Sequence, residues 1–342
     1  MTNQVSSTDN KVEENIWHIG PRTVPPPAGA SDVLYNSLSN TPTPDSAPNF
    51  ALDPQSEAEW LAVIAQMDEG KVDQAHALSK QLSVSVEHDT IEGVNVYHIT
   101  PAEVDPGLED KLFIHTHGGA FILNGGEAGT IEAIIIASLA KVRVLSIDYR
   151  MPPLHPAPAA RDDVMTVYQH LLKQRPAQKI ALGGSSGGAN LTMGLVQYLI
   201  KQGVDVPGAL FLGTPGADMS KTGDSYYIND GLDRNLVTYD GLIEAMVRLY
   251  ANGRDLKDPL VSPLYGDFHG FPPVFLVTGT RDLLLSATVR THIKLRQTGI
   301  VADILVYEGV AHADYMAELT APETQHTLAE LNAFLLQHLQ KG

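Results

Sequence analysis

Hydrophobic and polar positions change their spacing along the chain, and each change marks a different kind of structure. Residues 1–54 are rich in Ser, Thr, Asn and Pro and show no sustained period, so we expect this segment to be loosely packed. Apolar residues at helical spacing then predict two helices, at residues 55–68 and 72–82. Asp53 is the predicted N-cap of the first helix, with Pro54 at its first position.

After Leu82, short apolar runs of strand length alternate with helical patterns. This alternation indicates an α/β fold with a mostly parallel sheet of about eight strands, flanked by helices on both faces. No helix separates the first two strands, so the sheet should begin antiparallel. The predicted strands are residues 83–88, 94–100, 111–116, 142–147, 179–182, 209–213, 274–278 and 302–308. The predicted helices are residues 130–140, 160–174, 189–202, 239–250, 286–297 and 323–340.

The stretch at residues 217–253 interrupts this rhythm because it contains no strand pattern. We expect it to pack over the edge of the sheet together with the N-terminal helices. The chain is therefore predicted to form a catalytic domain from residues 83–216 and 254–342. A helical cap would consist of an N-terminal segment, residues 1–82, and a second part, residues 217–253.

Composition narrows the classes of function. Of 342 residues, 43% are apolar and 18% are charged, which suits one large domain with an appendage. The net charge of −17 disfavours nucleic acid and anionic membranes as partners. The absence of cysteine excludes disulfides, thiolate metal sites and a cysteine nucleophile. The first thirty residues lack the apolar core of a secretory signal, and no apolar run could span a bilayer, so we expect a cytoplasmic protein.

A glycine- and serine-rich turn supplies a candidate nucleophile. The strand at residues 179–182 runs into residues 183–188, GGSSGG, and then into a helix. This contains the pattern G-x-S-x-G centred on Ser185, which is typical of a nucleophilic serine on a tight strand-to-helix turn. A simple Gly/Ser turn or a phosphate-binding loop remains the alternative. Ser225 is a poorer candidate because no strand precedes it.

A second glycine loop supplies candidate oxyanion donors. The strand at residues 111–116 ends in residues 117–121, HGGAF. Consecutive glycines after a strand can present unshielded N–H groups, so Gly118 and Gly119 are predicted donors, joined by the N–H of Ser186. An ordinary βα turn is the alternative. His117 precedes the serine in the chain and is predicted to be a structural clamp on this loop.

The acid and the base are expected after the serine in chain order. Asp282 follows the end of the strand at residues 274–278, and His312 follows the end of the strand at residues 302–308. Other histidines and acids lack such a position. A metal site is not expected, because neither a carboxylate nor a third histidine lies at ligand spacing from His115 and His117.

Together these motifs resemble the hormone-sensitive-lipase-like family of α/β-hydrolases, the microbial family IV esterases. The likeness extends from about Leu112 to the C-terminus. It is carried by the HGG loop, DYR at residues 148–150, HPAPAA at residues 155–160, the serine turn, Asp282 and His312, and by GDSY at residues 223–226 with Asn229 and Asp233. Several positions depart from the family pattern; among them, Ala120 replaces a third glycine, and Gly184 replaces the aspartate before the serine.

The resemblance implies a serine carboxylesterase that acts on short- to medium-chain esters without a cofactor. Ser185 would be the nucleophile, His312 the base and Asp282 the orienting acid. A lactone hydrolase with the same triad and a non-catalytic binder of small ligands are the alternatives. Many family members form dimers through the edge strand, here expected near residues 302–308. Phe121, Tyr226 and Tyr227 are predicted to line the substrate pocket.

Overall fold

The computed structural model describes residues 20–339, so residues 1–19 of the predicted cap and residues 340–342 lie outside it. At its centre is an eight-stranded sheet in the order β1-β2-β4-β3-β5-β6-β7-β8. β2 pairs antiparallel with β1 and β4, and all other pairs are parallel. The strands are β1 Val84–Ile91, β2 Val94–Pro101, β3 Leu112–Thr116, β4 Val144–Asp148, β5 Ile180–Ser185, β6 Ala209–Gly213, β7 Val274–Gly279 and β8 Ala302–Tyr307. The predicted fold class, its strand number and the antiparallel start are confirmed.

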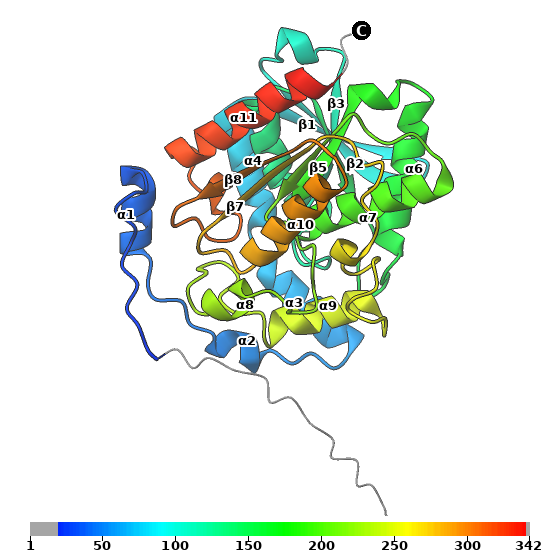
Figure 1. Cartoon of the computed structure of the whole chain (residues 1–342). Coiled ribbons are helices and arrows are strands. Elements are labelled where there is room, and N and C mark those ends of the chain that lie inside the picture. Colours follow the sequence, from blue (N-terminus) through cyan, green and yellow to red (C-terminus); the bar gives the residue numbers. More distant parts are fainter. Residues whose placement is uncertain (1–19, 340–342) are drawn as a thin grey trace, which may run out of the picture.

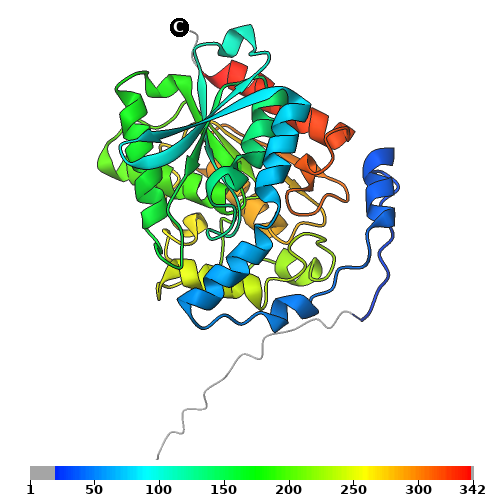
Figure 2. The ribbon, with the colours of Figure 1, turned by 180° about the vertical axis from the view of Figure 1, so that it is seen from behind.

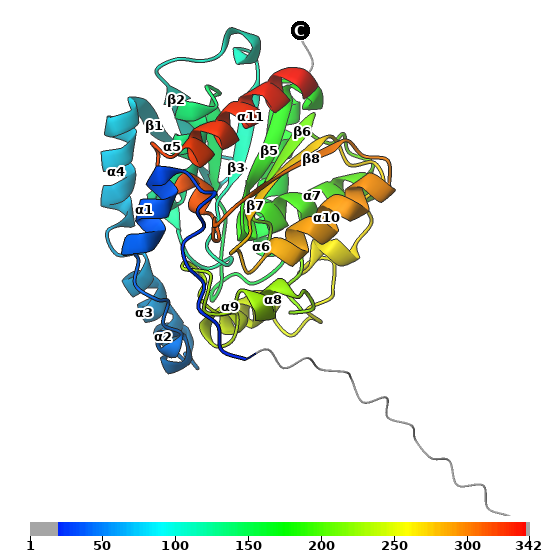
Figure 3. The ribbon, with the colours of Figure 1, turned by 60° about the vertical axis from the view of Figure 1, so that its left-hand side comes forward.

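Helices cover both faces of this sheet (Figures 1 and 3). On one face lie α5 (Thr130–Leu139) and α11 (Pro322–His338), which share a core cluster with the sheet. The other face is covered by α6 (Ala159–Leu172), α7 (Gly187–Gln202) and α10 (Leu285–Gln297). Because both faces are covered, β3, β5, β6 and β7 are buried along their whole length, which explains their uninterrupted apolar sequences.

The remaining helices include three that the sequence did not predict, α1 (Asp32–Asn40), α2 (Ala47–Ala51) and α8 (Ser225–Ile228). The others are α3 (Glu57–Met67), α4 (Lys71–Leu82) and α9 (Leu242–Ala251). Seen from opposite sides, α2, α3, α8 and α9 gather below one end of the sheet, whereas α4 runs beside it against α5 (Figures 1 and 2).

The predicted N-cap of α3 is wrong. Ser56 caps this helix, because its hydroxyl accepts the N–H of Glu59 while the Glu59 carboxylate accepts the N–H of Ser56. This reciprocal capping box satisfies two exposed donors at once, which the single side chain of Asp53 cannot do. Among residues 20–339, no helix is long and apolar enough to cross a membrane.

Candidate active site

In the turn between β5 and α7, the backbone of Ser186 is strained. Its backbone angles are φ 58° and ψ −120°, a combination that a residue with a side chain rarely adopts. A Cβ on Gly184 or on Gly188 would lie 1.9 Å from the carbonyl oxygen of Thr116 at the end of β3. Only glycine fits two residues before and two residues after Ser186. The six residues GGSSGG contain the pattern G-x-S-x-G twice, once centred on Ser185 and once on Ser186. The structure places Ser186 at the centre of the turn.

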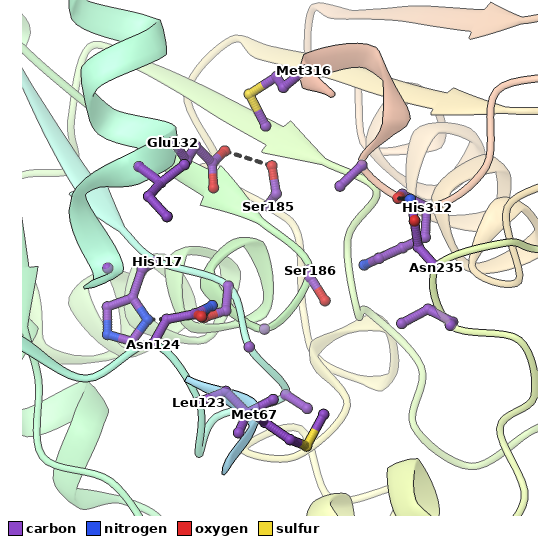
Figure 4. A pocket seen from close by; sticks show the side chains of 18 of the residues that line it. Met67, His117, Leu123, Asn124, Glu132, Ser185, Ser186, Asn235, His312 and Met316 are labelled. Carbon is purple, nitrogen blue, oxygen red and sulfur yellow. Dashed lines mark hydrogen bonds between the residues drawn. The ribbon is translucent and has the colours of Figure 1, made fainter. Parts of the chain in front are cut away.

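Ser185 has different surroundings. It is the last residue of β5, and its hydroxyl lies 2.5 Å from a Glu132 carboxylate oxygen and 2.5 Å from the Tyr315 hydroxyl. Figure 4 shows this side chain directed to Glu132 and not to His312. The geometry therefore does not support the prediction that Ser185 is the nucleophile. The strand ends at Ser185, three residues beyond its predicted end at Leu182, and the side chain of Ser185 points toward α5.

Asp282 and His312 are brought together as predicted. Nδ1 of His312 lies 3.1 Å from Oδ1 of Asp282, which leaves Nε2 on the far side of the ring. The Asp282 carboxylate is fully buried and also accepts the Thr278 hydroxyl at 2.7 Å and the Leu284 N–H at 2.8 Å. These bonds hold the acid in one orientation, so it can fix the ring of the base.

Burial and charge act in opposite directions on His312. Burial lowers the pKa of its imidazole, but the carboxylates of Asp282, Asp233 and Asp314 outweigh this effect and raise the pKa above the ordinary 6.5. A buried imidazole that binds a proton this readily is suited to accept one from a hydroxyl group.

The loop after β3 carries the other predicted site residues. Gly118 faces the serine turn, since a Cβ placed on it would lie 3.5 Å from Cβ of Ser186. The carbonyl of Gly118 accepts a bond from the Asn124 amide at 3.1 Å. Ala120, which stands where the family has a third glycine, adopts φ 50° and follows Gly119 at φ 114°. The loop is therefore folded tightly against the serine turn.

The prediction that the Ser186 N–H is an oxyanion donor is wrong. This N–H donates to the Gly213 carbonyl at 2.8 Å and is not available to a ligand. The next N–H, of Gly187, belongs to the first residue of α7, where a helix provides no partner for it. Moving the nucleophile to Ser186 moves the third donor to Gly187.

His117 lies beneath this loop. Its ring stacks on Tyr149 with centroids 4.1 Å apart, and the Tyr149 hydroxyl donates to the His117 carbonyl at 2.6 Å. Burial lowers the pKa of His117 to about 4, so its ring is neutral near pH 7. These contacts are those of a clamp, in agreement with the role predicted from its chain position.

A cavity of about 860 Å³ connects these groups and contains Ser186 and His312 in its wall. Of the predicted pocket residues, Phe121 and Tyr226 line the cavity. Tyr227 does not line it: its side chain is 65% exposed and lies near Lys221. Adjacent residues of a helix point in different directions, so on the single turn of α8 only Tyr226 faces inward.

Sequence reasoning missed other residues of this wall. Glu132, Asn235 and Met316 surround the serine turn and His312 in Figure 4. Glu132 is a single carboxylate in the apolar run IEAIII of α5, and this isolated charge was the available signal.

Comparisons with known proteins identify the fold family and the class of activity. The alpha/beta hydrolase fold family matches residues 113–316. An esterase of Acinetobacter venetianus is 33% identical over 66% of this chain and 74% of its own length. Among solved structures, esterase E25 has a TM-score of 0.95 and 80% identity, over 96% of this chain and 100% of that chain. An esterase of the bacterial hormone-sensitive lipase family has a TM-score of 0.70 and 26% identity, over 84% of this chain and 100% of that chain. The protein is an ester hydrolase, and it belongs to the hormone-sensitive-lipase-like family of the α/β-hydrolase fold.

Proposed function

We propose that the protein is a serine carboxylesterase that forms its acyl-enzyme on Ser186. The observation that carries this proposal is the backbone of Ser186 at φ 58° and ψ −120°, between two glycines packed against Thr116. A nucleophile on such a turn is exposed at the end of the sheet and stands at the N-terminus of a helix. Ser185 keeps a structural role through Glu132 and Tyr315.

In the first half-reaction, Oγ of Ser186 attacks the ester carbonyl while Nε2 of His312 takes the hydroxyl proton. Asp282 stabilises the imidazolium through its contact with Nδ1. The N–H groups of Gly118, Gly119 and Gly187 stabilise the oxyanion. Collapse of the tetrahedral intermediate breaks the ester C–O bond, and His312 returns the proton to the leaving alcohol. Water then attacks the acyl-enzyme by the same steps in reverse and releases the acid.

The cavity supports a short- to medium-chain ester as substrate. Its volume of about 860 Å³ lies within the range of small-molecule sites. Its wall is mainly apolar on two sides of the serine turn. One side has Leu78, Ile131, Ile135 and Leu319, and the other has Leu236, Leu242, Ile243 and Met246. These apolar side chains provide contacts for the acyl and alcohol parts of an ester.

Two adjacent serine variants test the nucleophile. Ser186→Ala should lower kcat for p-nitrophenyl butyrate by at least about 10³-fold, because the covalent step is lost. Ser185→Ala should keep measurable turnover, since it removes only supporting hydrogen bonds. Mass spectrometry should locate a fluorophosphonate adduct on Ser186. An adduct on Ser185, or full activity of Ser186→Ala, would overturn the assignment.

The acyl preference is tested with p-nitrophenyl esters from acetate to palmitate. We expect kcat/KM to peak at short or medium chains, because a cavity of about 860 Å³ lined by α4 and α9 has room for an acyl group of that size. A maximum at palmitate would contradict the proposed substrate class.

A further inference from the structure

The cap segment, residues 217–253, holds both sides of the catalytic acid. The buried amide of Asn229 donates to the carbonyl oxygens of Asp282 at 2.8 Å and Thr280 at 3.2 Å. The fully buried Asp233 carboxylate accepts the N–H of Leu283, the residue after Asp282, at 2.9 Å. Two cap side chains therefore fix the peptide groups that immediately follow Thr280 and Asp282.

The same segment also reaches the loop of the base. The amide of Asn235 donates to the His312 carbonyl at 2.6 Å and to a carboxylate oxygen of Asp314 at 2.8 Å. Asp233 in turn orients this part of the cap, because it accepts the N–H groups of Asn235 at 2.9 Å and Leu236 at 3.1 Å. The segment thus joins the acid loop and the base loop through one carboxylate.

Three carboxylates act on the His312 ring from three different elements. Asp282 follows β7, Asp314 lies on the 3-10 turn Asp314–Met316, and Asp233 belongs to the cap. Asp314 is paired with Arg234 at 2.8 Å, which offsets its charge. Within residues 20–339, Asp233 makes no ion pair with a lysine or an arginine, and its hydrogen bonds come from backbone N–H groups.

The burial of Asp233 has a measurable electrostatic consequence. Burial, followed by the neighbouring charge of Asp282, raises the pKa of the Asp233 carboxyl to about 6. Above that pH the carboxylate is ionised in a buried place beside the acid–base pair. An uncompensated buried charge acts strongly on its neighbours because solvent screens it poorly.

We propose that Asp233 is a positioning residue of the active site: it fixes the Asp282 loop through Leu283, and its charge strengthens His312 as a base. The inference rests on the proposed function, in which His312 takes the proton of Ser186. Asp233 itself touches neither the substrate nor the reacting atoms. Its effect should therefore be seen in the pH profile and in kcat, with little change in KM.

The test compares Asp233→Asn with Asp230→Asn. Both variants remove one carboxylate charge from the same cap segment, but Asp230 is exposed. We would measure fluorophosphonate inactivation rates and kcat/KM between pH 5 and 9. In Asp233→Asn the acid limb should move to lower pH by about one unit, since His312 loses an attractive charge. In Asp230→Asn the limb should stay at the wild-type position.

An acid limb of Asp233→Asn that coincides with that of the wild type would overturn the proposal, as would an equal shift in Asp230→Asn. If Asp233→Asn does not fold, Asp233→Glu provides the second test, because it keeps the charge and displaces the hydrogen bond to Leu283. It should lower kcat about tenfold and leave KM within about twofold. An unchanged kcat would contradict the positioning role of Asp233.

Failure of this inference can be separated from failure of the proposed function. Loss of turnover in Ser186→Ala and His312→Ala, with an unmoved limb in Asp233→Asn, would overturn only the role of Asp233. Retained turnover in both triad variants would overturn the proposed mechanism itself.

Discussion

Ser185→Ala removes a side chain that connects β5, α5 and the loop of the base. Its hydroxyl lies 2.5 Å from Glu132 on α5 and 2.5 Å from Tyr315, three residues after His312. Both partners lose a hydrogen bond when the hydroxyl is absent. Tyr315 is fully buried and Glu132 has only 13% of its side chain exposed, so water replaces the lost bonds poorly.

The size of the effect follows from these contacts. A hydrogen bond to a charged group contributes about 1.5–3 kcal/mol, and a buried hydroxyl left without a partner costs about 1–3 kcal/mol. Because Glu132 keeps some access to water, we expect Ser185→Ala to lower the free energy of unfolding by about 3 kcal/mol. For a chain of this length that corresponds to a fall in Tm of about 4 °C.

Thermal unfolding followed by circular dichroism would measure this difference. Ser39→Ala is the control, because the exposed Ser39 hydroxyl donates only to the Tyr35 carbonyl and its loss should cost less than about 0.5 kcal/mol. In a double-mutant cycle, Ser185→Ala and Glu132→Gln should couple by about 1–2 kcal/mol. A Ser185→Ala protein as stable as the wild type would refute the reasoning.

Three further predictions concern His312, the serine turn and the edge strand β8. Because the pKa of His312 lies above 6.5, kcat/KM should rise as pH increases through that folded-state pKa. The raised pKa of His312 also stabilises the fold below pH 6.5, and this contribution is lost as the pH rises through the folded-state pKa. A kcat/KM that increases as the pH falls below 6 would contradict the expected direction. Gly188→Ala should prevent folding or cost more than about 3 kcal/mol, because its Cβ would meet Thr116, whereas Gly187→Ala should fold normally, as protease resistance would report. If the chain dimerises through β8, sedimentation should show a dimer that the edge substitution Val306→Lys converts to a monomer, and a monomeric wild type would oppose this.

Strand and helix positions in the catalytic part were predictable because each element carries its own hydrophobic period. Helices α1 and α2 were not predictable, and the contacts of α1 show why. The N-cap of α1 is Ser31, whose hydroxyl and N–H both donate to the Glu323 carboxylate of α11, 292 residues away. No local pattern indicates such a contact. Asp282 and His312 were predictable from their positions after strands, because parallel strands end at the same edge of a sheet.

The sequence pattern alone does not decide which serine stands at the centre of the turn. GGSSGG contains G-x-S-x-G twice, and both readings follow a strand and precede a helix. The two readings differ in the backbone angles of the central serine and in which glycines approach Thr116. These two differences are visible only in the folded chain. In the corrected register Ser185 takes the position of the family's aspartate, so the apparent departure at Gly184 disappears. The carboxylate of Glu132 then lies beside that position, supplied from α5 instead of from the turn.

The loop of the base is thus held from opposite directions. Ser185, itself bonded to Glu132, holds Tyr315 on one side, while Asn235 of the cap donates to the His312 carbonyl on the other. Together with the bond from His312 to Asp282, these contacts hold Nε2 of His312 in place relative to the serine turn. Variants on the two sides should therefore lower kcat by less than the product of their single effects, because after the first loss the base is already misplaced. Multiplicative losses would mean that the two sides act on different steps.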